Sequence, residues 1–175
     1  MIARYILALD PSGSYQEGKG TTGWCLFDQD TDKIIKWGVI KAEDYSCQFQ
    51  YWDAHIRLID SLAGFNMDIV IEDYLLYSDR ANNQINSRLE TPQLLGIIKY
   101  EAYKRGLFIY IQPAMLVKKR WSNETLAYKG YIQCDARGRV SMGGISVVAH
   151  VQDSIRHAIH YKTYVSKYKS KGVRR

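Results

Sequence analysis

Asp10, Glu72, His150 and Asp153 have side chains that could hold divalent metal ions, and each stands near the end of a predicted strand or helix. Asp10 and Glu72 each directly follow a short apolar run. A carboxylate is costly inside a hydrophobic core, so these two side chains are expected in a cleft or at the surface. His150 and Asp153 are three residues apart near the start of a predicted helix, which puts both on one helix face.

The chemistry that such a group of residues can perform is hydrolysis of a phosphodiester bond. That reaction needs an activated water and relief of negative charge on the departing oxygen, and two divalent ions roughly 3.5–4 Å apart provide both. Hard oxygen ligands converging from several elements hold such ions.

Each of these residues also has an ordinary structural explanation. Asp10 precedes a proline, as turn residues do, Asp73 beside Glu72 suggests that one of the two is simply solvated, and Asp153 could stabilise a helix start.

The length and composition are those of one ordinary folded domain. The 175 residues include 46% hydrophobic and 24% charged side chains, enough to form a core without disulfides or structural metal. No stretch approaches the ~20 apolar residues of a membrane span, and no signal-peptide cleavage region is recognisable. Cys25, Cys47 and Cys134 form no CxxC pair and are odd in number, which argues against a disulfide framework. We therefore expect a cytoplasmic protein with reduced cysteines and no membrane partner.

Charge is distributed unevenly along the chain. Residues 1–90 hold 14 acidic and 8 basic side chains, whereas residues 91–175 hold 4 acidic and 16 basic ones. This split favours a basic face for a polyanion beside a carboxylate-rich region. A solvated surface with a basic tail would explain the composition equally well, so charge alone does not establish nucleic acid as the partner.

Hydrophobic periodicity predicts the elements that must position the candidate residues. Short apolar runs separated by turns predict strands over residues 5–9, 24–27 and 33–40, and their short connections predict an antiparallel meander. Apolar residues spaced three and four apart predict an amphipathic helix over residues 45–59. Two more strands are predicted over residues 68–71 and 107–111, and two more helices over residues 91–106 and about 147–168.

The order of these elements is βββ-α-β-α-β-α, which predicts an α/β fold with one five-stranded mixed sheet and helices on both faces. Thr91 followed by Pro92 is typical of a helix start, with threonine as N-cap and proline at the first helical position. Residues 115–145 contain several glycines and are predicted to be irregular. We expect a single domain over residues 1–161 and a partly disordered basic tail over residues 162–175, which hold six basic and no acidic side chains.

Several short motifs, in this order along the chain, resemble the RuvC family of the RNase H-like superfamily. They are ILALDPSG followed by GTTGW, IVIEDYLLY, PAMLVKKRW and HVQDSIRHAIHY. The resemblance implies an RNase H-like fold and a structure-selective endonuclease that resolves Holliday junctions during DNA recombination and repair. It also implies two Mg²⁺ ions per active site, with Mn²⁺ as a substitute, branched DNA as the substrate, and a homodimer with one site for each of two opposing strands.

The same resemblance assigns roles to individual residues. The catalytic and metal-binding residues of the family fall, by motif, on Asp10, Glu72, His150 and Asp153. The family lysine after the fifth strand falls on Lys118, which is expected to contact DNA or to stabilise negative charge near the scissile phosphate. The other expected DNA contacts are Lys119, Arg120, Tyr74, Tyr77 and Arg80.

The sequence departs from the family pattern at two places. The turn after Asp10 is longer by the segment SYQEGKG, which is similar to the divergent resolvases of bacteriophages and would make the host cytoplasm the site of action. The family's aromatic wedge for the junction centre would fall near Leu75, whereas the aromatic residues here are Tyr74 and Tyr77. This second departure bears on junction selectivity rather than on cleavage.

Other functions and roles are compatible with the same residues. An RNase H-type nuclease for RNA–DNA hybrids, or a flap or fork nuclease, would have the same catalytic cluster. In a non-catalytic nucleic-acid-binding or scaffolding protein the acids would be structural. Loss of any of the principal acids would favour this alternative, and none is missing. A sugar-kinase-like or actin-like ATPase would need two such domains.

Two further expectations concern helix faces: the stripe Leu94, Leu95, Ile98 and Ala102 packs on the core or faces a partner subunit, and His157 and His160 are ordinary surface histidines.

Overall fold

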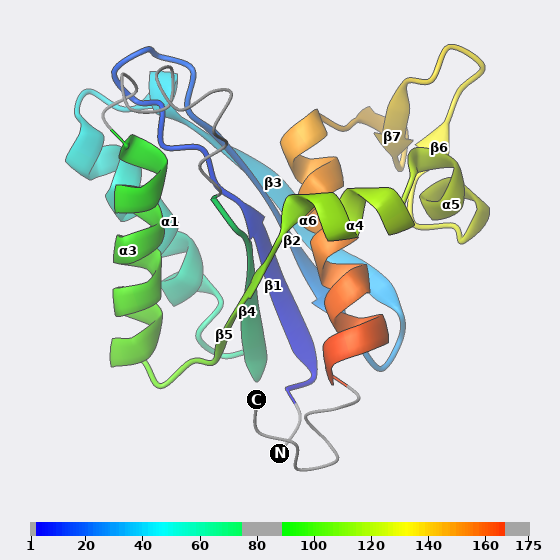
Figure 1. Cartoon of the computed structure of the whole chain (residues 1–175), viewed down its shortest axis with the longest axis horizontal. Helices are drawn as coiled ribbons and strands as arrows, with labels where there is room; N and C mark the ends of the chain where they lie inside the picture. The colour runs from blue at the N-terminus through cyan, green and yellow to red at the C-terminus, as the bar shows by residue number, and fades with distance from the viewer. Residues whose placement is uncertain (1–2, 75–88, 167–175) are drawn as a thin grey trace.

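One mixed five-stranded sheet runs through the computed structural model, which describes residues 3–74 and 89–166 (Figure 1). Strands β1 (Tyr5–Asp10), β2 (Thr21–Asp28) and β3 (Lys33–Lys41) are antiparallel neighbours, and β4 (Met67–Glu72) and β5 (Ile109–Gln112) continue the sheet parallel to β1. The strand order is β3-β2-β1-β4-β5. The predicted meander and mixed sheet are therefore confirmed.

Helices cover both faces of this sheet, as predicted (Figure 1). On one face, α1 (Gln48–Ser61) packs beside α3 (Glu90–Lys104), and on the other α6 (Ala149–His160) lies across β1, β2 and β4 beside α4 (Ala114–Arg120). The remaining elements are η1 (Ala42–Asp44), α5 (Asn123–Tyr128), the π-helical turn η2 (Tyr161–Ser166), and a second small sheet of β6 (Gln133–Cys134), β7 (Val140–Met142) and β8 (Ile145–Ser146).

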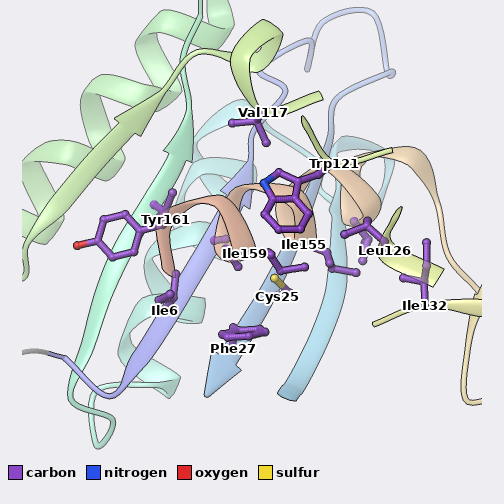
Figure 2. Packing of buried hydrophobic residues seen from close by; sticks show 14 of the residues in the cluster. Ile6, Cys25, Phe27, Val117, Trp121, Leu126, Ile132, Ile155, Ile159 and Tyr161 are labelled. Carbon is purple, nitrogen blue, oxygen red and sulfur yellow. The ribbon is translucent and has the colours of Figure 1, made fainter. Parts of the chain in front are cut away.

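The sheet separates two hydrophobic clusters because successive side chains of a strand point to opposite faces. In β1, Ile6 and Ala8 pack against the α6 face, whereas Leu7 and Leu9 pack against α1 and α3. Figure 2 shows the α6 side of the core, with Ile155 and Ile159 of α6 above the sheet. The same alternation, continued to the last residue of the strand, turns Asp10 toward α6.

The prediction that residues 115–145 are irregular is wrong. This stretch contains α4, α5 and strands β6–β8. Val117, Trp121 and Leu126 from these short elements are buried in the α6-side core (Figure 2). Helices this short have little stability of their own and depend on tertiary packing, so their sequences carry too few apolar repeats to predict them.

The predicted cap of α3 is also wrong. The helix begins at Glu90, and the residue in the N-cap position is Leu89, in left-handed conformation with φ 52°. The Thr91 hydroxyl instead accepts a hydrogen bond from the backbone N–H of Gly13, at 2.9 Å. A Cβ atom at Gly13 would lie 2.2 Å from the backbone of Glu90 and Thr91, so the glycine allows the turn after Asp10 to rest directly on the start of α3.

The apolar stripe of α3 belongs to the core of this chain. Its members Leu94, Leu95, Ile98 and Ala102 are all buried in the cluster on the α1 and α3 side. The prediction that this stripe packs on the core is confirmed. The alternative prediction, that it faces a partner subunit, is wrong because all four side chains are buried within this chain.

Beyond α6 the helical structure continues through η2 to Ser166, in agreement with the helix predicted over residues 147 to about 168. Val165 packs against the core and Lys162 forms an ion pair with Asp32. Residues 167–175, the rest of the expected tail, lie outside the described residues. None of the described helices is long and apolar enough to cross a membrane.

His55 of α1 makes the stability of the fold dependent on pH. Its Nδ1 donates to the Tyr51 carbonyl at 2.8 Å, which leaves Nε2 to accept from the Thr22 hydroxyl at 2.8 Å. Burial lowers the pKa of this imidazole to about 4. Between pH 6.5 and 4 the unfolded chain binds a proton that the native state does not, so stability from this group is complete above about pH 6.5 and is lost as the pH falls.

We expect His55→Gln to flatten the acid limb of the stability curve. A shift of this size corresponds to about 3 kcal/mol in the free energy of unfolding between pH 7 and pH 4. Urea unfolding at several pH values, for the parent and the variant, measures the difference directly. Parallel curves for the two proteins would show that His55 does not couple to folding in this way.

Candidate active site

Asp10 and Glu72 are brought together by the parallel pairing of β1 and β4. The register places Leu9 beside Ile71, so both acids stand at the same end of neighbouring strands. Glu72 continues the face of Val70, which packs on the α6 side as Ala8 does. Asp10 is 6% exposed and Glu72 is partly buried. The two carboxylates therefore converge under α6, as the strand-end positions predicted.

Helix α6 can lie this close to the sheet because β2 has a glycine opposite Asp10. Gly23 pairs with Asp10 in the sheet register. A Cβ atom on Gly23 would lie 2.1 Å from the carbonyl carbon of His150 and 2.3 Å from the amide nitrogen of Val151. The first turn of α6 is thus in contact with the backbone of β2, beside the end of β1.

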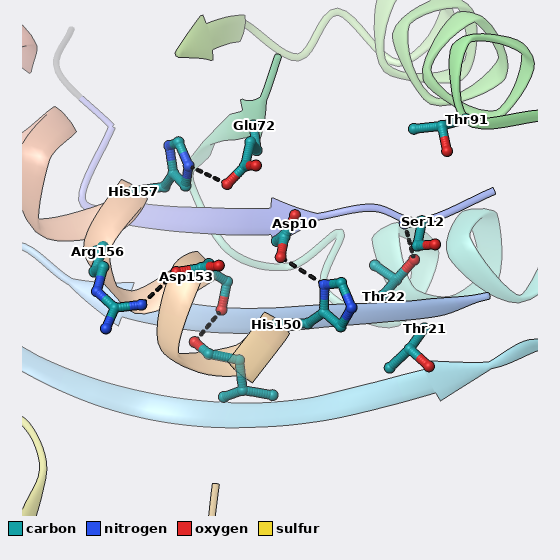
Figure 3. Close-up of polar contacts among 12 residues, drawn as sticks. Asp10, Ser12, Thr21, Thr22, Glu72, Thr91, His150, Asp153, Arg156 and His157 are labelled. Atoms are coloured by element: carbon teal, nitrogen blue, oxygen red, sulfur yellow. Dashed lines mark hydrogen bonds and ion pairs between the residues drawn. The ribbon is translucent and has the colours of Figure 1, made fainter. Parts of the chain in front are cut away.

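From this position α6 completes a cluster of three carboxylates. The potential ligand atoms of Asp10, Glu72 and Asp153 all lie within 4.8 Å of one another. Among the described residues, His150 is not part of this group of potential metal ligands. His150 contacts the cluster through Asp10, with 2.6 Å between Nδ1 and Oδ2 (Figure 3). All four residues predicted for the site are therefore in one place.

The charges of the cluster shift the pKa values of its members. Burial raises the pKa of Asp10 above its usual value, the hydrogen bond with His150 opposes this, and repulsion from Glu72 and Asp153 adds to it. The same hydrogen bond raises the pKa of His150, against the effect of burial. Buried carboxylates that repel one another favour the binding of a cation.

Lys118 of α4 is the basic residue that contacts two of the acids. Its Nζ lies 2.9 Å from Oδ2 of Asp153 and 3.5 Å from Oε1 of Glu72. Although burial disfavours the charged amine, the hydrogen bond to Asp153 and the charges of the three acids raise the pKa of Lys118. The predicted lysine is therefore next to the carboxylates, where α4 follows directly on β5.

Sequence reasoning missed the role of His157, and the expectation of a surface histidine is wrong. The side chain is fully buried. Its Nε2 lies 2.9 Å from Oε2 of Glu72 (Figure 3). Its Nδ1 lies 2.8 Å from Oε1 of Gln112. The available signal was its spacing of four residues from Asp153, which puts both on one face of α6. His160, the other histidine expected at the surface, is partly buried.

Arg156 was not predicted either. Its guanidinium pairs with Oδ1 of Asp153 and bonds Oδ1 of Asn123. Its Nε donates to the carbonyl oxygen of Trp121 at 2.8 Å. Arg156 therefore ties Asp153 to the segment that joins α4 and α5.

The expected DNA contacts have different locations. Lys119 and Arg120 are exposed on α4, and the Arg120 guanidinium lies 4.7 Å from the ring centroid of Tyr164. Tyr74 is partly buried against the core cluster on the α1 and α3 side. Tyr77 and Arg80 lie outside the described residues.

The strand order and helix placement define an RNase H-like α/β fold, and solved structures of RuvC share it. The Thermus thermophilus RuvC complex with a Holliday junction substrate superposes with a TM-score of 0.64 at 15% identity, covering 95% of both chains. Another T. thermophilus RuvC structure gives a TM-score of 0.61 at 14% identity, covering 93% of this chain and 96% of that one. No family model matches the sequence, and no curated protein was found to be similar to it. The predicted resemblance to RuvC is thus confirmed in the fold.

The residues present fit a divalent metal ion. All three converging donors are carboxylate oxygens, which Mg²⁺ and Mn²⁺ prefer as ligands. Two of them already hold a cation, the Lys118 ammonium. The repulsion that raises the pKa of Asp10 would be relieved by a positive charge at the same place.

Proposed function

We propose that this protein is a metal-dependent endonuclease that cleaves branched DNA, resolving Holliday junctions by paired nicks. The observation that carries the proposal is the convergence of Asp10, Glu72 and Asp153 within 4.8 Å, at strand ends and on a helix of an RNase H-like fold. The similarity in fold to RuvC, which has been solved with a Holliday junction substrate, supports the choice of substrate. A homodimer would supply one site for each of two opposing strands.

The proposed roles follow from the contacts of each side chain. Asp10, Glu72 and Asp153 would hold two Mg²⁺ ions, or Mn²⁺ in their place. His150 would either bind a metal ion directly or orient the Asp10 carboxylate, which it contacts. When bound, such ions supply an activated water and stabilise the departing oxygen. The chain's own part is to keep the three carboxylates together against their mutual repulsion, which His150 and Lys118 reduce.

Lys118 is proposed to stabilise negative charge on the scissile phosphate. Its ammonium is shared between Asp153 and Glu72, and its side chain is 45% exposed, so it can also face a bound phosphate. Lys119 and Arg120, exposed on the same helix, are proposed to contact the DNA backbone nearby. Tyr74, Tyr77 and Arg80 remain proposed DNA contacts.

A cleavage assay on a panel of substrates tests the proposal. The purified full chain would be incubated with Mg²⁺ or Mn²⁺ and with end-labelled four-way junction, Y-fork, RNA–DNA hybrid and plain duplex. We expect paired, symmetrical nicks in the junction and little cleavage of the duplex, with no cleavage in EDTA. Preferred cleavage of the hybrid or the fork would assign the same site to a different substrate, and binding without any cleavage would identify a non-catalytic nucleic-acid-binding protein.

The basic end of α4 gives a separate prediction about affinity. Each phosphate contact that is lost should flatten the plot of log affinity against log salt by about 0.9. We expect Lys119→Ala with Arg120→Ala to weaken binding to junction and duplex alike and to reduce the salt slope by up to about 1.8. Lys118 is left intact because its removal would also disturb Asp153 and Glu72.

The matched control replaces Lys99 and Lys104 with alanine. Both are exposed on α3, on the opposite face of the sheet. Fluorescence anisotropy with labelled DNA at several salt concentrations compares the two double variants. If both pairs changed affinity equally, the effect would come from net charge, and α4 would not be the DNA-binding surface.

A further inference from the structure

Glu72 is bonded at its two oxygens by different elements. Oε2 lies 2.9 Å from Nε2 of His157 in α6, whereas Oε1 lies 3.5 Å from the ammonium of Lys118 in α4. The His157 ring is itself fixed from behind, because its Nδ1 lies 2.8 Å from Oε1 of Gln112. Gln112 ends β5 at the position paired with Glu72. A chain of contacts thus runs from β5 through α6 to the carboxylate at the end of β4.

The direction of the hydrogen bond to Glu72 follows from the charges. The Glu72 carboxyl lies between the Lys118 ammonium, 3.5 Å from Oε1, and the His157 ring, 2.9 Å from Oε2, and these surroundings favour its ionised form. An ionised carboxylate only accepts hydrogen bonds, so Nε2 of His157 carries the hydrogen. Nδ1 contacts Oε1 of the Gln112 side-chain amide, whose buried nitrogen has no hydrogen-bond partner among the described residues. Rotating that amide changes the partner atom of Nδ1 and leaves Nε2 as the donor.

We propose that His157, supported by Gln112, is a positioning residue that makes Glu72 bind a divalent ion through Oε1 alone. With Oε2 held by a fully buried ring, the carboxylate cannot turn freely about its last torsion, which is otherwise broad in glutamate. Oε1 then faces the same space as Lys118 and Asp153. This inference rests on the metal site of the proposed function and adds the element that orients one of its ligands.

The other two acids are held in the same way. His150 bonds Oδ2 of Asp10, and Arg156 bonds Oδ1 of Asp153. In each of the three carboxylates, a side chain of α6 therefore bonds one oxygen. The other oxygen of each carboxylate is left to face the centre of the cluster, where a metal ion would bind. Partners of this kind, outside the ligands themselves, typically contribute about 10- to 100-fold to metal affinity.

Mn²⁺ binding to the full chain without DNA tests this role independently of cleavage. In His157→Gln the side-chain amide nitrogen reaches about where Nε2 was and can donate to Glu72. In His157→Asn the amide reaches only the position of Nδ1, next to Gln112. We expect His157→Gln to bind Mn²⁺ within about threefold of the parent, and His157→Asn and His157→Leu to bind it about 10- to 100-fold more weakly, as measured by calorimetry or by the EPR signal of free Mn²⁺.

His160→Asn is the matched control, because His160 is on the same helix and is within hydrogen-bond distance of none of the three acids among the described contacts. It should bind Mn²⁺ like the parent. Equal affinities for His157→Asn, His157→Gln and the parent would overturn the positioning role while leaving the metal site in place. A parent that bound no Mn²⁺ would overturn the proposed function, and this inference with it. Thermal unfolding of each variant identifies any loss that comes from misfolding.

Discussion

Asp10→Asn is expected to abolish cleavage while junction binding is retained or becomes tighter. Asp10 belongs to the three-carboxylate cluster, and the substitution removes one ligand charge and one negative charge facing the phosphate. We expect turnover to fall by about 10²–10³-fold or more, the range for removing a group that stabilises charge in an active site. Single-turnover cleavage and a binding assay on the same junction would measure both effects.

The same substitution should not destabilise the fold. Because burial and repulsion raise the pKa of Asp10, its charged form is disfavoured in the native state, and a neutral amide of the same shape removes that cost. We expect the melting temperature to stay equal or to rise, since groups kept for function often reduce stability. Asp73→Asn is the matched control, because Asp73 follows Glu72 directly but lies outside the cluster. Near-normal turnover in folded Asp10→Asn protein would refute the central role of this acid.

The parts of the site that sequence could predict are those with a local signal. Asp10 and Glu72 end buried strands, and a strand-end carboxylate has to lie at the edge of a sheet. The spacing of His150 and Asp153 gave their common helix face. What the sequence leaves open is which hydrogen-bond partners these residues have.

His157 illustrates that limit. Its spacing from Asp153 gives their common helix face, but its two partners, Glu72 and Gln112, are 85 and 45 residues away in the sequence, and no local pattern identifies them. Arg156 is similar, because its partners outside α6 come from the α4–α5 region, the part of the chain predicted to be irregular. Both errors come from contacts that exist only once α6 has packed on the sheet.

Gly23→Ala is expected to be strongly destabilising although it adds only one methyl group. The added Cβ would lie 2.1–2.3 Å from the backbone of His150 and Val151, whereas real Cβ contacts are almost never under 3.0 Å. Backbone atoms cannot turn aside as a flexible side chain can, so the first turn of α6 must move away from β2. Overpacking typically costs about 1–3 kcal/mol, and we expect at least the upper end here.

Moving α6 should affect the chemistry as well as the stability. His150, Asp153 and His157 all reach the strand-end acids from this helix, so a shift of α6 should weaken Mn²⁺ binding and cleavage in any Gly23→Ala protein that still folds. Gly96→Ala is the control, because a Cβ there meets nothing within 4 Å and alanine favours the interior of α3 by about 0.5–1 kcal/mol. Melting temperature, Mn²⁺ affinity and turnover should all fall together for Gly23→Ala and stay level or rise for Gly96→Ala. If Gly23→Ala kept the parent's metal affinity and turnover, close contact between α6 and β2 would not be what holds the carboxylates together.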